Sequence, residues 1–234
     1  MIQIFQSEIL DVKNLPGSVK IFQLSVPQNF SFKAGQYVSI SVPFEGKKIR
    51  RPYSIASSPN KKKIIDLCVK IIPGGLASDY LKDLKKGDKV ELFGPAGKFV
   101  IYGDSLERDI IFVAVGTGIT PFVSMIHDLL EKEFKNKIIL IKGFRYNENI
   151  LYEKEFSELG KNHKNFEFHN VLSRPDEEDY ENKGYVQDFL EKCISDISNS
   201  DVYICGLSPM INAVKEKAIE LKIPENRVFF EKYD

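Results

Sequence analysis

Cysteine and histidine are scarce in this chain of 234 residues, and tryptophan is absent. The three cysteines, Cys68, Cys193 and Cys205, are widely spaced and odd in number, so they form neither a disulfide framework nor a zinc pattern. They also cannot supply the four thiolates of an iron–sulfur cluster. The three histidines show no ligand spacing, so no metal site is expected, and the cysteine usage suits a reducing, cytoplasmic compartment.

Long apolar runs are also missing, although hydrophobic residues make up 43% of the chain. No stretch approaches the roughly 20 apolar residues that a membrane span requires. The first eight residues contain neither a basic segment nor a long apolar stretch, so we expect no secretory signal. The length allows one large domain or two small ones.

The net charge is zero, but it is unevenly distributed. Residues 1–101 contain 16 Lys and Arg against 8 Asp and Glu, whereas residues 102–234 contain 17 against 25. Opposite net charges of +8 and −8 suggest two domains with different partners, none of them nucleic acid. Ordinary solvated surface charge explains the same counts equally well.

The first hundred residues contain short segments in which apolar and polar side chains alternate, the pattern of half-buried strands. These segments span residues 19–26, 36–42, 64–71 and 89–93. Turn residues follow them, as in Gly94-Pro95-Ala96-Gly97, and one short helix is expected at residues 77–84. Several short strands at this spacing predict a small antiparallel barrel.

The pattern changes after a polar stretch at residues 102–109, which we interpret as a linker. Residues 110–115 are continuously apolar, as in a parallel strand covered on both faces. Further strands are expected at 138–141, 166–172, 201–205 and 227–231, alternating with helices at 121–134, 151–159, 186–193 and 209–221. This alternation predicts a doubly wound parallel sheet, and we place the two domains at residues 1–102 and 108–234.

The run Arg51-Pro52-Tyr53-Ser54 places a cation, an aromatic ring and a hydroxyl within four residues, just after a strand-like segment. Arg can hold a phosphate through two parallel charge-assisted hydrogen bonds. Tyr offers a flat apolar face, and Ser can hydrogen-bond a ring nitrogen. The grouping suits a planar, phosphorylated cofactor, although four residues alone are equally well explained by a strand end with incidental polar residues.

Two glycine turns precede predicted helices. Gly116-Thr117-Gly118-Ile119-Thr120-Pro121 follows the apolar strand, and its glycines would let the backbone approach a pyrophosphate at a helix N-terminus. A proline stands where the dinucleotide fingerprint has its third glycine, so a plain strand-to-helix turn stays open. The second turn is Gly74-Gly75-Leu76-Ala77-Ser78, for which a structural role is the simpler reading when it is taken alone.

A further segment, Cys205-Gly206-Leu207-Ser208-Pro209-Met210, follows a predicted strand at the end where open parallel sheets bind ligands. Taken in order, Arg-x-Tyr-Ser, Gly-x-x-Ser, Gly-Thr-Gly-x-Thr-Pro and Cys-Gly-x-x-x-Met resemble the ferredoxin–NADP reductase family. The resemblance covers nearly the whole chain and does not include an iron–sulfur domain. It implies a six-stranded antiparallel Greek-key barrel that binds flavin, followed by a doubly wound nucleotide-binding α/β domain.

The resemblance also implies roles for individual residues. Arg51 would hold an FAD phosphate, Tyr53 would stack on the isoalloxazine, and Ser54 would lie near flavin N5. Cys205 would lie beside the nicotinamide. The FAD-binding set is Arg51, Pro52, Tyr53, Ser54, Val69, Gly74, Gly75, Leu76, Ala77 and Ser78. The NADP-binding set is Gly116, Thr117, Gly118, Ile119, Thr120, Pro121, Arg145, Ser173, Arg174, Lys183, Tyr185, Cys205, Gly206 and Met210.

The C-terminal Glu231-Lys232-Tyr233-Asp234 resembles the Glu-x-Tyr ending of plant-type members, in which the Tyr stacks on the flavin and the Glu lies near the active site. Ser54, Cys205, Glu231 and Tyr233 are therefore the expected catalytic residues. Asp234 follows the Tyr and departs from that pattern, so a frayed end with an incidental aromatic stays open.

Coenzyme choice depends on cations and hydroxyls that could bind a 2′-phosphate. Ser173-Arg174 and the later Lys183-Gly184-Tyr185 resemble the NADPH-selective members, and Arg145 could add a further cation. Residues 176–179 are four consecutive acids, which would repel a 2′-phosphate if they folded toward it. We expect NADPH, with NADH as the alternative.

The implied activity is hydride transfer between NADPH and FAD, with single electrons passing to or from an acidic carrier such as ferredoxin or flavodoxin. The positive first part of the chain would attract such a carrier. An NAD(P)H-flavin reductase and an NADH-dependent reductase component of an oxygenase share this layout. A non-catalytic regulatory subunit should tend to lose the stacking Tyr or the nearby Ser, and both Tyr53 and Ser54 are present.

Overall fold

The computed structural model describes residues 2–194 and 196–233. Its internal contacts divide the chain into two compact units. The first unit runs to Val100 and includes Thr120–Asp128, and the second comprises Ile101–Ile119 and the chain from Leu129 onward.

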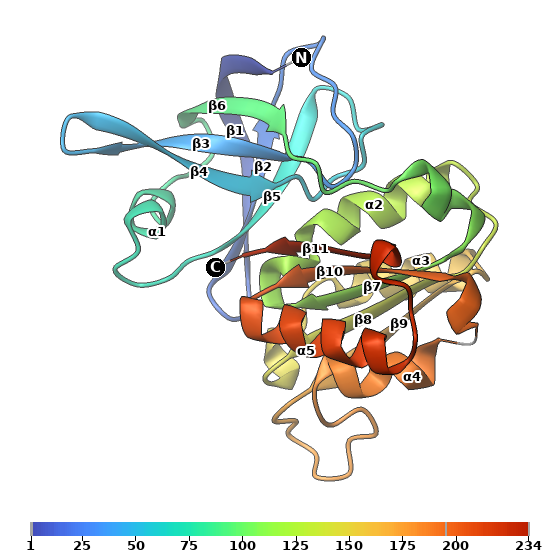
Figure 1. Cartoon of the computed structure of the whole chain (residues 1–234). Coiled ribbons are helices and arrows are strands. Elements are labelled where there is room, and N and C mark those ends of the chain that lie inside the picture. The colour runs from blue at the N-terminus through green and yellow to red at the C-terminus, as the bar shows by residue number, and fades with distance from the viewer. Residues whose placement is uncertain (1, 195, 234) are drawn as a thin grey trace. The chain divides into compact units, whose positions relative to one another are not determined.

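The first unit contains a six-stranded antiparallel sheet in the order β4-β3-β6-β1-β2-β5 (Figure 1). Its strands are β1 (Gln3–Leu15), β2 (Val19–Ser25), β3 (Tyr37–Phe44), β4 (Lys47–Ser54), β5 (Ile64–Lys70) and β6 (Lys89–Ala96). A bridge joins Ile55, the residue after edge strand β4, to Leu67 in the middle of the other edge strand, β5, so the sheet curls into a barrel. The predicted six-stranded barrel is confirmed.

The core of the barrel follows the alternation read from the sequence. Phe22 and Leu24 on β2, like Val38 and Ile40 on β3, are two residues apart and fully buried. Side chains at such spacing face the same side of a strand, so each strand contributes one apolar row to the interior. The only helix expected in residues 1–100 is α1 (Leu76–Leu81), which ends three residues earlier than predicted.

The Arg51 run lies inside a strand rather than after one. Glu45 and Gly46 both have positive φ, +47° and +74°, and form the two-residue turn that joins β3 to β4. Pro52 fits in β4 because this strand is at the edge of the sheet and pairs only with β3. The polar composition of β4 had concealed the strand.

The first nine residues of helix α2 (Thr120–Glu131) pack within the first unit. Ser124 Oγ donates a hydrogen bond to the Ser57 carbonyl at 2.7 Å, and the rings of Phe122 and Phe99 lie 5.9 Å apart. The helix ends before the predicted residue 134 because Glu133 adopts a left-handed φ of +55°. The boundary at residues 102 and 108 stays a prediction about the functional domains.

The second unit contains a five-stranded parallel sheet in the order β11-β10-β7-β8-β9 (Figure 1). Its strands are β7 (Asp109–Val115), β8 (Ile138–Phe144), β9 (Phe166–Leu172), β10 (Ser200–Gly206) and β11 (Val228–Lys232). Helix α3 (Glu153–Asn162) packs on β9, and α5 (Ser208–Glu220) packs on β10 and β11. The predicted doubly wound sheet is confirmed.

Three expected segments differ in detail. The supposed linker contains a 3-10 turn, η1 (Gly103–Glu107), whose Ser105 is fully buried. Helix α3 begins two residues later than predicted because Tyr152 has a left-handed φ of +58°. The helix expected at 186–193 is a 3-10 turn, η4 (Val186–Phe189), followed by the short α4 (Leu190–Cys193). No helix of the described residues is both long and apolar enough to cross a lipid bilayer.

Candidate functional site

The end of β4 presents the residues expected to hold a flavin. Arg51 and Tyr53 are two residues apart and share one face of the strand, Arg51 exposed and Tyr53 half-buried. Ser54 points the other way and is 5% exposed. Burial raises the pKa of Tyr53 to about 12, with the Arg51 charge acting in the opposite direction. At neutral pH this ring is therefore uncharged, as a stacking surface for a fused ring requires.

The turn before α1 has an open backbone face. Gly74 has a φ of +75°, and a Cβ placed there would meet no atom within 4 Å. Ser78 Oγ accepts a hydrogen bond from the Ile72 amide at 2.9 Å, which leaves its hydroxyl proton to donate elsewhere. An accessible turn with one hydroxyl donor fits a pyrophosphate, the group expected here. Val69, at the end of β5, is buried.

The turn after β7 lies against the end of β10. This turn is the 3-10 segment η2 (Gly116–Ile119), which leads into α2. A Cβ on Gly118 would lie 2.3 Å from the Cys205 carbonyl oxygen, so only glycine permits this approach. Gly116 has a φ of +57° and has no atom within 4 Å of its Cβ position, which leaves its backbone open to a ligand. The turn fits a pyrophosphate at the C-terminal edge of the sheet.

Cys205 is joined by the C-terminal residues of the described chain. It pairs with Glu231 in the register of β10 and β11, and the Tyr233 amide donates to the Gly206 carbonyl at 3.0 Å. Burial raises the pKa of the Cys205 thiol well above its usual value; the Glu231 charge raises it further, and a hydrogen bond with Tyr233 opposes this. Cys205 is therefore a neutral thiol and not a thiolate nucleophile.

The structure thus brings together three of the expected catalytic residues, Cys205, Glu231 and Tyr233, on adjacent strand ends. Met210 also belongs here, because a Cβ on Gly206 would lie 2.6 Å from its Cε. Asp234 lies outside the described residues. Ser54, the fourth expected catalytic residue, belongs to the other unit.

The predicted 2′-phosphate residues also gather at this edge of the sheet, on the loops after β8 and β9. The Arg174 amide donates to the Arg145 carbonyl at 2.9 Å, and the Ser173 amide donates to the Phe144 carbonyl at 3.1 Å. Lys183 forms an isolated bridge with Leu172, which returns the second loop to the sheet. Three cations from two loops therefore lie at one edge of the sheet. Tyr185 is 64% exposed.

The acidic stretch 176–179 is hydrogen-bonded to the loop that follows β8. Asn147 Oδ1 accepts from the Asp176 amide at 3.0 Å, and Asn147 Nδ2 donates to Glu177 Oε2 at 3.2 Å. No pattern in the sequence predicted this pair of hydrogen bonds. They hold Glu177 beside Asn147, two residues from Arg145, while residues 176–179 stay exposed.

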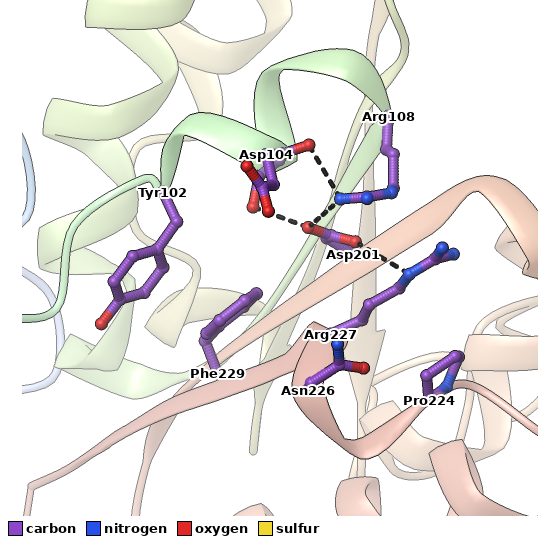
Figure 2. A pocket seen from close by; sticks show the side chains of 9 residues that line it. Tyr102, Asp104, Arg108, Asp201, Pro224, Asn226, Arg227 and Phe229 are labelled. Atoms are coloured by element: carbon purple, nitrogen blue, oxygen red, sulfur yellow. Dashed lines mark hydrogen bonds and ion pairs between the residues drawn. The ribbon is translucent and has the colours of Figure 1, made fainter.

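Sequence reasoning also missed a pocket of about 340 Å³ at the opposite, N-terminal edge of the parallel strands (Figure 2). Asp201, 1% exposed, lies between Arg108 and Arg227. Its Oδ2 accepts from Ser105 Oγ at 2.6 Å and Arg108 Nη1 at 3.5 Å, and Arg227 Nε lies 4.0 Å from Oδ1. Arg108 had been assigned to a linker, which concealed the cluster.

Comparison with known proteins gives the class of this chain. Residues 6–101 match the family model of the oxidoreductase FAD-binding domain, and residues 112–216 match that of the oxidoreductase NAD-binding domain. The chain is 32% identical over 239 residues to ferredoxin–NADP reductase B of Sorangium cellulosum, with 98% of each chain covered. It is 34% identical to the reductase component of phenol 2-monooxygenase from Pseudomonas sp. strain CF600, of which it spans 63%.

Solved structures agree. The Amycolatopsis cytochrome P450 reductase GcoB superposes with a TM-score of 0.90 at 27% identity, over 99% of this chain and 70% of that one. The Plasmodium falciparum ferredoxin–NADP+ reductase with 2′P-AMP superposes with a TM-score of 0.83 at 26% identity, over 99% and 97%. The chain is an FAD- and NAD(P)-dependent oxidoreductase. It belongs to the ferredoxin–NADP reductase family.

Proposed function

We propose that this enzyme oxidises NADPH and passes the electrons singly to an acidic protein carrier of the ferredoxin or flavodoxin kind. Bound FAD supplies the step from hydride to single-electron chemistry. The observation that carries the proposal is the C-terminal edge of the parallel sheet, where a glycine turn, the neutral Cys205 thiol and three cations are gathered.

On the flavin side, the residues of the first unit bind and orient. Arg51 is exposed and can grip a phosphate with its guanidinium fork, and the neutral Tyr53 ring provides a flat surface for stacking. Ser54, at the end of β4, is buried and is assigned to hydrogen bonding at the reacting edge of the flavin. The open turn at Gly74 and the hydroxyl of Ser78 are assigned to the pyrophosphate.

On the coenzyme side, residues of the second unit orient the nicotinamide. The turn at Gly116 and Gly118 receives the pyrophosphate through backbone amides. Cys205 contributes a compact, uncharged surface that is assigned to packing beside the nicotinamide. Tyr233, hydrogen-bonded to that thiol, is assigned to controlling access to the ring.

We assign NADPH as the preferred coenzyme. Arg145, Arg174 and Lys183 come from two loops that backbone hydrogen bonds hold together, and a 2′-phosphate would bind such cations. The P. falciparum relative was solved with 2′P-AMP, which carries this phosphate. Glu177, hydrogen-bonded to Asn147 two residues along the chain from Arg145, brings a negative charge to the same loops and should limit the preference.

The carrier is assigned from charge. The first unit's strongly positive sequence would attract an acidic partner and raise the association rate, which should then fall as salt screens the attraction. Sorangium ferredoxin–NADP reductase B matches this chain along 98% of its length, which favours a reductase that serves a ferredoxin-like carrier. The second candidate, a reductase component of an oxygenase, is favoured by the phenol 2-monooxygenase relative, although 37% of that relative lies outside the match.

A cytoplasmic place of action is part of this proposal. Cys68, Cys193 and Cys205 are all free thiols, which suits a reducing compartment.

Stopped-flow reduction of the purified flavoprotein by NADPH and by NADH tests the coenzyme assignment directly. We expect NADPH to reduce the flavin at lower concentration, and we expect the rate with ferredoxin or flavodoxin, but not with a small uncharged acceptor, to fall as salt rises. Equal use of both coenzymes would refute the NADPH assignment. A carrier rate that ignores ionic strength would refute the steering.

A further inference from the structure

Lys142 is a charged residue buried in the middle of the parallel sheet. It lies on β8 within the run Ile138–Phe144, and its side chain is 0% exposed. Its ammonium group donates to the Leu151 carbonyl at 2.9 Å and to Glu153 Oε2 at 3.0 Å. Both acceptors lie at the start of α3, at the end of the loop that follows β8.

Aromatic rings form the rest of its surroundings. The Lys142 ammonium lies 5.8 Å, 5.2 Å and 4.9 Å from the ring centroids of Phe144, Phe156 and Phe168. Cation–π attraction and the ion pair offset part of the cost of burying the charge, but an apolar side chain of equal size would stabilise such a site about as well. A role in arranging its neighbours therefore explains the lysine better than stability does.

Its neighbours form a chain of hydrogen bonds that reaches a second loop. Glu153 Oε2 also accepts from Asn170 Nδ2 at 2.9 Å, and Asn170 faces Lys142 across the register of β8 and β9. The Asn170 carbonyl accepts from the Tyr180 hydroxyl at 3.3 Å. Tyr180 belongs to the loop after β9, residues 173–184.

The two loops reached by this chain carry the cations assigned to the coenzyme. Residues 145–152 present Arg145, and residues 173–184 present Arg174 and Lys183. The loops are joined to each other where they leave the sheet by the Arg174–Arg145 backbone bond, and a few residues further on by Asn147. Lys142 adds a connection through Glu153 and Asn170.

We propose that Lys142 is a positioning residue: it holds the loops after β8 and β9 in the arrangement that binds the 2′-phosphate end of the coenzyme. The inference rests on the proposed NADPH site and goes further, because it places a determinant of coenzyme choice in the interior of the sheet. A buried ammonium can do this because it donates at once to the Leu151 carbonyl in the first loop and to Glu153, and Glu153 also accepts from Asn170, shortly before the second loop. A methyl or thioether group can fill the same space without fixing either acceptor.

Binding of two small probes to Lys142→Met tests the proposal. Calorimetric titration with 2′,5′-ADP and with 5′-AMP separates the 2′-phosphate from the rest of the adenosine half. We expect the variant to bind 2′,5′-ADP about fivefold more weakly, the scale of one charge-assisted hydrogen-bond network, and to bind 5′-AMP unchanged. Lys154→Met, an exposed lysine on the same helix as Glu153, is the matched control and should leave both affinities unchanged.

Tyr180→Phe provides an independent variant if Lys142→Met does not fold. It removes only the link from Asn170 to the second loop, and we expect it to weaken 2′,5′-ADP binding about twofold with 5′-AMP unaffected. Unchanged 2′,5′-ADP affinity, or an equal loss for both probes, would overturn the positioning role alone. A wild-type protein that does not prefer 2′,5′-ADP to 5′-AMP would overturn the NADPH site and this inference with it.

Discussion

The two ends of strand β10 contain buried ionisable groups in opposite situations. Asp201, near the start, lies between two arginines and a serine hydroxyl that compensate its charge. Cys205, four residues later, lies beside a glycine turn whose backbone is open to a ligand, and Tyr233 is hydrogen-bonded to its thiol. At the first end, two arginines offset the charge of a buried carboxylate, although its Oδ1 has no hydrogen-bond partner among the described residues, and this end serves the fold. The second leaves donors available and serves a ligand.

Asp201→Asn should destabilise the cluster at the start of β10. The substitution leaves Arg108 and Arg227 facing each other in a largely buried site without their counter-charge, and we expect a loss of about 3 kcal/mol in the free energy of unfolding. Urea unfolding measures this. Flavin reduction by NADPH in the folded variant should match wild type, and a slowed reduction would show that this end also acts in function.

Gly118→Val should disrupt the ligand site at the end of β10. Its side chain would meet the Cys205 carbonyl at 2.3 Å or less, so the turn must move away from β10. We expect NADP+ affinity to fall by about 100-fold, measured by titration, because the pyrophosphate cradle is displaced. Gly160→Ala is the control: its Cβ would meet nothing nearer than 3.7 Å, and coenzyme binding should not change.

Lys142→Met sharpens the comparison with a third buried charge. Burial lowers the pKa of Lys142 to about 8, and the neighbouring Glu153 charge opposes this shift. Tyr180 is the other titratable group close to Glu153. Between pH 8 and the ordinary lysine value of 10.5, the unfolded chain holds the proton and the folded chain does not, so wild-type stability rises with pH through this window.

The methionine variant lacks this group. Its free energy of unfolding relative to wild type should therefore decline by about 2 kcal/mol from pH 7 to pH 10. Thermal unfolding of both proteins across this pH range measures the difference. A difference that does not depend on pH would contradict the lowered pKa.

Cys205→Ala should give the smallest effect. Removal of the sulfur leaves a small cavity and takes away the surface assigned to the nicotinamide, so we expect hydride transfer to slow about tenfold with FAD still bound. Single-turnover kinetics measure this. Cys68→Ala, at a buried cysteine of the barrel, is the matched control and should reduce stability without changing the transfer rate.

The sequence predicted the parallel sheet well because its central strands are continuously apolar: residues 110–115 could hardly belong elsewhere. It missed β1 and β4 for the opposite reason. Both strands lie mainly at the surface, and their polar side chains give little alternation to detect. Helix ends were misplaced where a residue such as Tyr152 or Glu133 takes a left-handed backbone that its identity does not announce.

The candidate site was predictable where motifs carry backbone chemistry, as at Gly118, whose close approach to Cys205 explains the glycine. The supporting contacts were not. Asn147, Asn170 and Tyr180 act through partners that are 10 to 30 residues away in the chain, and such pairings depend on the folded register. Lys142 alone gave a signal, a charge within an apolar run, which had been read as the end of a strand.

The placement of Thr120–Asp128 has a consequence for anyone who wishes to cut this chain. A fragment that stops at residue 102 would lose Phe122 and Met125, both fully buried, and would strip the Ser57 carbonyl of its hydroxyl donor. The barrel would then expose an apolar patch beside Phe99 and Gly35 and tend to aggregate. A protein engineer who transfers the barrel to another chain must therefore also transfer the first part of α2, which lies in the sequence between β7 and β8 of the parallel sheet.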